Sequence, residues 1–538
     1  MQKSLVLGVS FIVIVISVFV SYLTRPTVDE MANTGLLFIS SAAKAHSVCV
    51  KASKFVRKVL YINIKDSSET TLPVLSRQID NLYSKASSTC GNLDVRLMLN
   101  LSDHSAKIRT HHLIDVILYD HELARESERL IQSVSTLQGE CKMHSIDMQD
   151  LPQDQTPTEP VQTYEYVALG GTFDRLHNGH KILLSQAALR ATKHVTVGVT
   201  GVNMIQTKKL WELIEPVEQR ISEVLKFLKD VNPNLEYNVF PLEDLYGPTK
   251  DDPKFQLLVV SEETVQGGLK INEKRKENGL EPLDIYTIPL AADSHPQRSN
   301  EEETKLSSSN TRMRLLGTLL KPPVPNPNIP EWPYVIGLAG GIASGKSNIA
   351  NKLKEKGAAI VNCDTIAHSL YAPGLPLNST ILETFGEEVI TETGEVDRKR
   401  LGQIVFSDKS KLDQLNEILW PAILEEAQRQ TVSLGAAGAR VVVMEAAVMV
   451  RAKWYQYCHQ LWTVIVPPEE AIKRIQKRNN LSEEEARQRV ENQPSNLEQV
   501  APANIVFSPY WSYEYTQSQI DRAWNNLQEH LDKRKSKI

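Results

Sequence analysis

Cysteine is scarce in this sequence. Its 538 residues include only five, namely Cys49, Cys90, Cys141, Cys363 and Cys458. They are scattered, and none stands in the C-x-x-C spacing typical of zinc sites and redox-active dithiols. We interpret them as reduced thiols of a protein that faces the cytosol, which argues against a disulfide framework and a zinc site.

The sequence also lacks an excess of positive charge. Lys and Arg number 60 against 65 Asp and Glu, which gives a formal net charge of −5. This balance argues against non-specific nucleic-acid binding, and we expect no nucleic-acid partner. Hydrophobic residues make up 41% and charged residues 23%, as in globular proteins. The length predicts roughly three or four domains.

Charge is missing altogether from residues 4–24, which are rich in Val, Ile, Leu and Phe. About 20 such residues span a bilayer. The segment has no convincing A-x-A cleavage site, so residues 1–25 are predicted to be an uncleaved membrane anchor, with a cleaved signal peptide as the alternative. Basic residues near the span favour a cytosolic location for the rest of the chain. Lys3 precedes the span, and Lys44, Lys51, Lys54, Arg57 and Lys58 follow it.

Residues 26–146 are predicted to form a small α/β domain, to which the sequence assigns no role. Strand-like alternation occurs at 60–64, 93–101 and 116–119, and helical patterns occur at 81–83 and 122–134. The domain contains no catalytic constellation. Four histidines fit no metal-ligand spacing and are interpreted as exposed, namely His104, His111, His112 and His121. Residues 147–163 are rich in Gln, Asp, Pro and Thr and are predicted to be a linker.

A nucleotide-binding pattern opens the next domain, residues 164–320. A buried-type strand at 166–169 leads into G-G-T-F-D-R-L-H-N-G-H at 170–180 and then into a helix. His177 and His180 are three residues apart at the start of that helix, so both imidazoles lie on one face and can bond to phosphate oxygens. Gly179 leaves room for a nucleotide. The alternative is a pair of surface histidines beside a turn.

A serine-rich turn near the end of this domain supports the same interpretation. The hydroxyls of Ser308 and Ser309 and the guanidinium of Arg312 suit a triphosphate. Strand and helix patterns alternate between the two motifs, which predicts a doubly wound parallel sheet.

The third domain, residues 334–538, follows a proline-rich linker at 321–333 and begins with a phosphate-binding loop. G-x-x-x-x-G-K-S at 340–347 lies between a strand-like run and a helical one, as the motif requires. Lys346 can reach the outer phosphates and Ser347 can hold Mg²⁺. The loop residues expected to surround the phosphates are Gly340, Gly341, Ile342, Ala343, Ser344 and Gly345.

Acids and arginines complete a phosphoryl-transfer pattern. Asp364 is predicted to end a strand at 357–364, where it can accept a proton from the attacking hydroxyl, with a helix-capping role as the alternative. Glu445 ends the strand at 440–445 and is predicted to orient Mg²⁺ or its water. Arg478 and Arg489 lie on two successive helices. The chain is interrupted between them at residues 479–482, and Ser482 is expected to cap the second helix. The pair is predicted to be a lid that closes over phosphates, or alternatively a solvated face.

The motifs of residues 164–320, namely the pattern at 170–180 and the serine-rich turn, closely resemble those of the nucleotidyltransferase superfamily, and of phosphopantetheine adenylyltransferase in particular. The resemblance implies a Rossmann-like fold, ATP and 4′-phosphopantetheine as substrates, and no protein nucleophile. It implies that Thr172, His177 and His180 contact ATP phosphates and that Lys208 contacts substrate phosphate from a mobile loop. Gly170 and Phe173 belong to the same nucleotide-binding motif.

The motifs of residues 334–538, which begin with the phosphate-binding loop, resemble those of dephospho-CoA kinase. The resemblance implies that Asp364 is the base for the 3′-hydroxyl of dephospho-CoA. Together, in this order, the two domains resemble the eukaryotic family of bifunctional coenzyme A synthases, which implies the cytosolic face of the mitochondrial outer membrane.

The chain departs from these family patterns at several positions. The kinase pattern has an acid where this chain has Asn362, a glutamate at Arg451 and a histidine at Trp420, and the transferase pattern has a glutamate at Gln219. Asn362 and Arg451 motivate an alternative, an active adenylyltransferase whose impaired kinase half serves as a membrane-tethered scaffold. A class I aminoacyl-tRNA synthetase shares the H-x-G-H signature, but the absence of a basic anticodon-binding domain and the phosphate-loop tail argue against it.

Overall fold

The computed structural model describes residues 31–41, 44, 50–65, 71–90, 93–99, 107–148, 160–296 and 298–535. Contacts divide the chain into two compact units, residues 1–310 and 311–538. The division falls inside helix α8 (Ser308–Leu315), whereas the sequence placed a domain boundary after residue 320.

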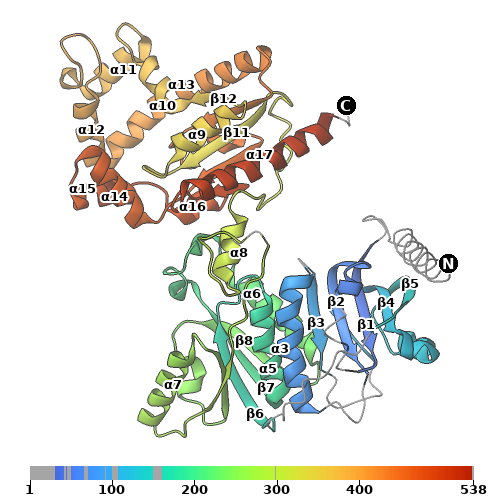
Figure 1. The fold of residues 1–538 in the computed structure, drawn as a ribbon. Helices are drawn as coiled ribbons and strands as arrows, with labels where there is room; N and C mark the ends of the chain where they lie inside the picture. Colours follow the sequence, from blue (N-terminus) through green and yellow to red (C-terminus); the bar gives the residue numbers. More distant parts are fainter. Residues whose placement is uncertain are drawn as a thin grey trace, which may run out of the picture. The chain divides into compact units, whose positions relative to one another are not determined.

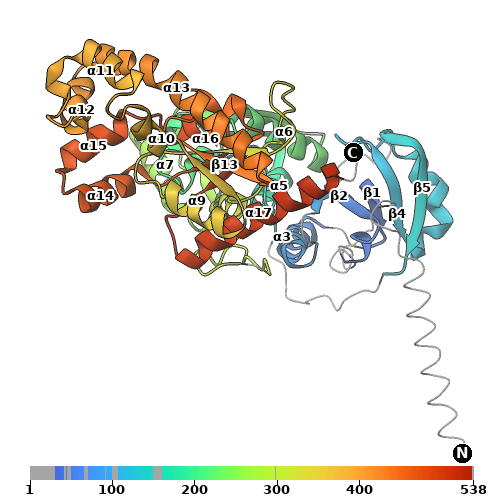
Figure 2. The same ribbon diagram turned by 90° about the horizontal axis from the view of Figure 1, so that it is seen from above.

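The first sheet of unit 1 belongs to the N-terminal domain, residues 31–148. Its strand order is β3-β2-β1-β4-β5, and every pairing is parallel. Figure 1 shows the strands following one another in this order, and Figure 2 shows β2, β1, β4 and β5 in the same order. The strands are β1 (Ala32–Ile39), β2 (Val56–Ile64), β3 (Asp94–Met98), β4 (Ile114–Asp120) and β5 (Leu137–Ile146). Helix α3 (Leu72–Thr89) connects β2 to β3, while η3 (His121–Glu126) and α4 (Ser127–Gln132) connect β4 to β5.

The second sheet of unit 1 is also parallel, in the order β10-β9-β6-β7-β8, which confirms the predicted doubly wound sheet. Both sheets of unit 1 therefore place their first strand at the centre and share the order 3-2-1-4-5. The strands are β6 (Tyr164–Gly171), β7 (Ala191–Thr200), β8 (Glu236–Leu242), β9 (Leu257–Ser261) and β10 (Asp284–Ile288). The helices are α5 (Asn178–Arg190), α6 (Val217–Val231) and α7 (Val265–Glu277), with short turns η4 (Val202–Met204), η5 (Trp211–Leu213) and η6 (Gly247–Lys250).

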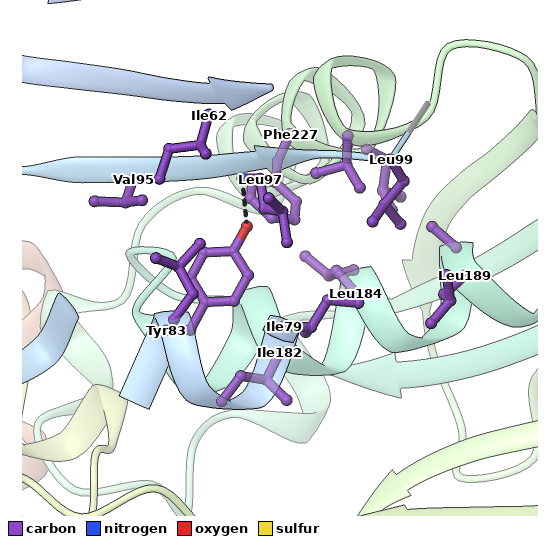
Figure 3. Close-up of a cluster of buried hydrophobic side chains, with 14 of the residues drawn as sticks. Ile62, Ile79, Tyr83, Val95, Leu97, Leu99, Ile182, Leu184, Leu189 and Phe227 are labelled. Carbon is purple, nitrogen blue, oxygen red and sulfur yellow. Dashed lines mark hydrogen bonds between the residues drawn. The ribbon is translucent and has the colours of Figure 1, made fainter. Parts of the chain in front are cut away.

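One hydrophobic core joins the two sheets of unit 1. Figure 3 shows side chains of α3 and β3 packed against side chains of α5 and α6. Tyr83 of α3 is fully buried in this core, and its hydroxyl accepts a hydrogen bond from the Leu97 N–H at 3.0 Å. The N-terminal domain is therefore part of the same packed body as the second sheet, since its helix α3 lies against α5.

Unit 2 is built on a third parallel sheet, in the order β12-β13-β11-β14-β15. The central strand β11 is buried at every position, as expected for a parallel strand covered on both faces. Helices α9 and α17 cover one face, and α10 and α13 cover the other. The strands are β11 (Tyr334–Gly340), β12 (Ala359–Asn362), β13 (Val441–Glu445), β14 (Gln460–Val464) and β15 (Ile505–Phe507).

Some helices of unit 2 pack on one another instead of on this sheet. Helices α11 to α13 share a small hydrophobic core of their own, around Ile381 and Val405. From α9 onward, the helices are α9 (Lys346–Glu355), α10 (Cys363–Leu370), α11 (Pro376–Phe385), α12 (Arg398–Ser407), α13 (Lys409–Ala436), α14 (Pro468–Asn479), α15 (Glu483–Glu491), α16 (Asn496–Val500) and α17 (Tyr513–Lys535), with turns η7 (Glu387–Val389) and η8 (Trp454–Tyr457).

Within the ranges that the structure describes, no helix is long and apolar enough to cross a membrane. The predicted anchor, residues 1–25, lies outside those ranges. Four cysteines fall inside them and are free thiols: Cys90, Cys141, Cys363 and Cys458. Cys49 lies outside.

Candidate active sites

The first candidate site lies at the carboxyl end of β6, the central strand of the second sheet. β6 ends at Gly171, and the chain then turns sharply because Phe173 and Arg175 adopt positive φ angles of 50° and 48°. Residues other than glycine rarely hold this conformation unless their surroundings fix it. The Phe173 side chain is buried, and a Cβ atom at position 171 would lie 3.0 Å from its ring. Glycine at 171 therefore gives the Phe173 ring the space it needs.

The two histidines of this site are stacked on each other. His177 precedes the first residue of α5, and His180 lies in the first turn of that helix. Their ring centroids are 3.8 Å apart, and the ring planes are inclined by 20°. A Cβ atom on Gly179 would lie 3.2 Å from the His177 ring, so a side chain at 179 would press against the histidine. The expectation that both imidazoles lie on one face is confirmed.

Burial sets the charge state of these histidines. It lowers the pKa of His177 well below its usual value, with a further contribution from His180, and it lowers the pKa of His180 to about 3. Both rings are therefore neutral near pH 7. The Nδ1 atoms of both are enclosed and have no hydrogen-bond partner among the described residues, although buried polar atoms are usually paired. The site thus presents two unpaired imidazole nitrogens.

Arg220 of α6 holds the loops around the histidines in place. This side chain is 1% exposed and donates three hydrogen bonds to backbone carbonyls, of Thr172 at 2.7 Å, Glu215 at 2.8 Å and Thr200 at 3.0 Å. The sequence assigned no role to Arg220, although it directly follows Gln219, one of the departures from the family pattern. The neighbouring Gln219 bonds to the Glu215 side chain at 3.1 Å, so the departure at 219 leaves these three bonds intact.

The serine-rich turn reaches the histidine loop. The Ser308 hydroxyl donates to the carbonyl of Asp174 at 3.0 Å, and Asp174 is itself fully buried. Ser309 and the buried Arg312 follow on the same helix, α8. Lys208 is exposed on the loop between η4 and η5, beyond the carboxyl end of β7. The structure therefore brings Ser308 to the turn before His177 and places Lys208 on a separate loop at the same edge of the sheet.

The second candidate site is the loop between β11 and α9. Gly340, Ala343 and Gly345 have positive φ angles of 154°, 58° and 92°. A Cβ atom at Gly340 would lie 2.8 Å from the Val464 carbonyl oxygen, so only glycine fits there. This succession of conformations turns backbone N–H groups inward and forms a concavity suited to an anion. A cavity of about 480 Å³ opens beside the loop, and residues 341–348 line it.

Several of the predicted residues meet at this cavity. Asp364 and Arg478 line it together with the loop, and so do Arg474 and Gln493, to which the sequence assigned no separate role. The side-chain oxygen of Gln493 accepts a hydrogen bond from the Ile342 N–H at 2.7 Å. Arg489 is exposed on α15, outside the set of residues that line the cavity.

Glu445 is the hub of the polar contacts in this site. It is 2% exposed, and its Oε1 atom lies 2.8 Å from the Lys346 Nζ and accepts a hydrogen bond from the Ser347 hydroxyl at 2.7 Å. Its Oε2 atom accepts a hydrogen bond from the Asn362 amide at 3.1 Å. Asn362 therefore suits its surroundings, since an amide donates where a second carboxylate would repel Glu445.

The prediction that Asp364 ends a strand is wrong. Strand β12 ends at Asn362, and Asp364 lies in the first turn of α10. The reason is that the Asn362 side chain accepts a hydrogen bond from the Thr365 N–H at 2.9 Å, which starts the helix two residues early. The Asp364 carboxylate is 55% exposed and lies 3.8 Å from the Lys346 Nζ, so it still faces the site.

Arg451 has an acidic partner. Its guanidinium lies 3.6 Å from the Asp413 carboxylate and 5.9 Å from the centre of the Trp420 ring. Two of the departures from the family pattern, at 451 and 420, are therefore neighbours. The positive charge at 451 is compensated within this chain.

The helix pair α14 and α15 lies over the phosphate-binding loop. Ser482 caps α15 as predicted, in a reciprocal arrangement with Glu485. Ile475 and Ala486 form the core between the helices, and the side chains of Ile342 and Ala343 pack against it. The contacts fit a lid, and that role stays a prediction.

The described residues contain no group of three or more His, Cys, Asp or Glu arranged to hold a metal ion. His111 and His121 are exposed, His112 is half-buried, and His104 lies outside the described residues. The predicted magnesium ligands are fewer, namely the oxygens of Ser347 and Glu445. Mg²⁺ is commonly held by one or two protein oxygens together with phosphates and water, so this donor set fits the ion.

Comparisons with known proteins agree with the two sites. A family model described as dephospho-CoA kinase matches residues 334–509, and one described as cytidylyltransferase-like matches residues 168–314. The dephospho-CoA kinase of Carboxydothermus hydrogenoformans is 39% identical over 186 residues, which cover 35% of this chain and 90% of that protein. The dephospho-CoA kinase of Syntrophus aciditrophicus is 37% identical over 193 residues, which cover 36% of this chain and 82% of that protein. A solved structure of the Campylobacter jejuni dephospho-CoA kinase is 23% identical, with a TM-score of 0.30. The match covers 36% of this chain and 98% of that one.

We expect acidification to destabilise unit 1 through His177 and His180. Because burial lowers the pKa of both rings, the unfolded chain binds protons below pH 6.5 that the folded chain excludes. Stability is therefore retained near pH 7 and falls as the pH drops below about 6.5, by up to about 1.4 kcal/mol per pH unit for each ring. Denaturant unfolding between pH 7.5 and 5.5 measures the loss.

The matched comparison is the double variant His177→Asn/His180→Asn, which should lose less stability over this range than the wild type. His121→Asn, at an exposed position, should follow the wild type. Equal losses in all three proteins would contradict the assignment of neutral, half-buried imidazoles.

Proposed function

Because this chain belongs, through residues 334–509, to the dephospho-CoA kinase family, we propose that it catalyses the last two steps of coenzyme A synthesis. At the first site, an adenylyl group passes from ATP to 4′-phosphopantetheine and yields dephospho-CoA and pyrophosphate. At the second site, ATP phosphorylates the 3′-hydroxyl of dephospho-CoA and yields CoA and ADP. The observation that carries the proposal is the presence of two separate phosphate-binding arrangements in one chain, the stacked histidines and the phosphate-binding loop.

The first reaction needs positioning and charge stabilisation but no nucleophile from the protein. An oxygen of the phosphopantetheine phosphate attacks the α-phosphorus of ATP, and the bond to the departing pyrophosphate breaks. The imidazole N–H groups of His177 and His180 donate to phosphate oxygens, and the N-terminus of α5 adds positive potential. Neutral rings suit this role, because each keeps one donor and one acceptor nitrogen. Thr172, Lys208, Ser308, Ser309 and Arg312 are proposed to bind the phosphates as the family resemblance implies.

The second reaction uses Asp364 as the proton acceptor. The 3′-hydroxyl loses its proton to the carboxylate and attacks the γ-phosphorus of ATP, and ADP leaves. The exposure of Asp364 leaves it open to an incoming hydroxyl, and Lys346 lies close enough to neutralise phosphate charge. Mg²⁺ held by Ser347 and Glu445 would supply further charge neutralisation. Arg478 and Arg489 are proposed to close over the phosphates and exclude water.

The structure bears on the scaffold alternative as well. Asn362 caps α10 and bonds to Glu445, and Arg451 pairs with Asp413, so neither departure leaves an uncompensated charge in the kinase domain. Lys346 and Asp364 are both present. We therefore favour a kinase half that is active over one that has lapsed.

We further propose that residues 1–25 anchor the chain in a membrane, with both catalytic units in the cytosol. The uncharged run at 4–24 and the basic residues that follow it support this proposal. The family resemblance favours the outer mitochondrial membrane.

Substitutions at each site should separate the two reactions. Lys346→Ala should abolish CoA formation while dephospho-CoA accumulates, and Asp364→Asn should do the same, since each removes a group used only in the second step. His180→Ala should block the first step but leave added dephospho-CoA convertible to CoA. Mass spectrometry of the products measures all three. Normal CoA production by Lys346→Ala would contradict the kinase assignment, and equal loss of both steps in His180→Ala would contradict separate sites.

The contact between Arg451 and Asp413 predicts a charge-swap result. Arg451→Glu places two acids together and should lower the free energy of unfolding by up to about 1 kcal/mol in a denaturant titration, which is the size that exposed charge pairs contribute. The double variant Arg451→Glu/Asp413→Lys restores opposite charges and should recover the wild-type value. A double variant no better than Arg451→Glu would contradict the compensation.

Deletion of residues 1–25 should release the protein from the membrane fraction while both activities persist. The intact chain should resist carbonate extraction, and protease added to sealed mitochondria should digest its catalytic units. A soluble full-length chain would contradict the anchor. A mature protein that starts near residue 26 would favour the cleaved signal peptide.

A further inference from the structure

The N-terminal domain contacts the two residues that flank Gly179 and His180. Asn178, between the two histidines, donates from its side-chain amide to the Ser87 hydroxyl at 2.9 Å. Lys181, directly after His180, is 4% exposed, and its Nζ lies 2.5 Å from the Asp94 carboxylate and 3.1 Å from the Val95 carbonyl oxygen. Ser87 lies at the end of α3, and Asp94 begins β3. The first turn of α5 is thus bonded on both sides of His180 to the N-terminal domain.

A chain of alternating charges extends this contact to α6. The Asp94 carboxylate also bonds to Arg96 at 2.7 Å, and Arg96 bonds to Asp230 of α6 at 2.6 Å. The Tyr61 hydroxyl donates to the same Asp230 oxygen at 2.8 Å. Lys181, Arg96 and Asp230 are nearly inaccessible to solvent, whereas Asp94 is 30% exposed. Although burial opposes ionisation of Asp94, the positive charges of Lys181 and Arg96 lower its pKa, so it is ionised at neutral pH.

These polar contacts are directional, whereas the contacts of the apolar core are not. The core around Tyr83 and Leu184 holds the two sheets together, but hydrophobic packing is non-directional. Buried ion pairs contribute little net stability because desolvation offsets their attraction, yet they require one geometry. Charges that must meet at fixed distances therefore set the position of the first turn of α5 relative to β3.

The N-terminal sheet has the same strand order as the second sheet, but different side chains lie at the carboxyl ends of its strands. At the carboxyl end of β1, where the second sheet carries its histidine loop, Lys44 is 1% exposed and lies 2.8 Å from Asp120 and 2.7 Å from Glu122. Two carboxylates at this edge oppose the binding of a phosphate. The described part of this edge therefore differs from the edge of the second sheet that carries the histidines, and the N-terminal domain meets those histidines through its contacts with α5.

We propose that the N-terminal domain is a positioning element for the adenylyl-transfer site, in which Asp94 and Ser87 fix the first turn of α5 and with it the stacked imidazoles. Asp94 and Ser87 are positioning residues, since they act through Lys181 and Asn178. The proposal rests on the function proposed for the first site. It assigns a role to residues 31–148, for which the sequence offered none.

Three variants of the full-length chain test the proposal. Asp94→Asn keeps the shape of the side chain but removes the charge that fixes Lys181. Ser87→Ala removes the hydroxyl that fixes Asn178 at little cost to folding. Asp120→Asn is the matched control, because it breaks a buried ion pair of the same domain, with Lys44, that does not touch α5. Each variant is assayed for both reactions, so conversion of added dephospho-CoA to CoA serves as an internal standard.

Misplaced catalytic groups cost rate, so the expected loss is in kcat. The kcat of adenylyl transfer should fall about 10- to 100-fold in Asp94→Asn and about 3- to 10-fold in Ser87→Ala, with KM values changed far less and the second reaction unchanged. Asp94→Glu, which restores the charge, should recover part of the rate. Asp120→Asn should retain adenylyl transfer within about 2-fold.

Wild-type kcat in both Asp94→Asn and Ser87→Ala would overturn the proposal, and so would an equal loss in Asp120→Asn, which would indicate general destabilisation of the domain. If Asp94→Asn fails to fold, Ser87→Ala decides alone. A failure of the proposed function appears differently, because the wild type itself would then form no dephospho-CoA.

Discussion

Parallel pairing is the constraint on which this structure depends. In all three sheets of the described residues, the first strand lies at the centre and its neighbours on either side run in the same direction. The connections from a central strand diverge to opposite faces, and a crevice opens at its carboxyl end. The histidine loop follows β6, and the phosphate-binding loop follows β11, so both sites lie at the carboxyl end of a central strand. The position of each site is thus a consequence of strand order.

Charged groups at both sites are held by other charged or polar groups of the protein. Glu445 holds Lys346, Ser347 and Asn362 in one arrangement, and Arg220 holds three carbonyls around the histidines. Such arrangements are costly to desolvate, but they keep reactive groups oriented before substrate arrives. The contact from Asp94 to Lys181 extends the same principle across a domain boundary.

Local sequence signals predicted most of the strands and both loops, but in the N-terminal domain they missed β1, the central strand, and β5. The glycines of both loops and the buried runs before them carry their information within about ten residues, so G-G-T-F-D and G-K-S could be recognised directly. Long-range partners could not be recognised in this way. Asp94 and Lys181 are 87 positions apart, and neither position has a pattern that points to the other.

The remaining errors also have physical reasons. Asp364 was assigned to a strand because apolar residues precede it, whereas the capping side chain of Asn362 starts the helix before it. Arg451 looked disruptive until the structure placed Asp413 beside it, since compensation depends on which helix packs against the loop. In both cases the deciding contact is made by a side chain outside the motif.

The most direct test of the account is a time course with the intact chain, Mg-ATP and 4′-phosphopantetheine, with products followed by mass. The account predicts that dephospho-CoA appears first and then declines as CoA accumulates, because one chain carries both sites. Accumulation of dephospho-CoA without CoA would contradict an active kinase half, and formation of neither product would contradict the account as a whole.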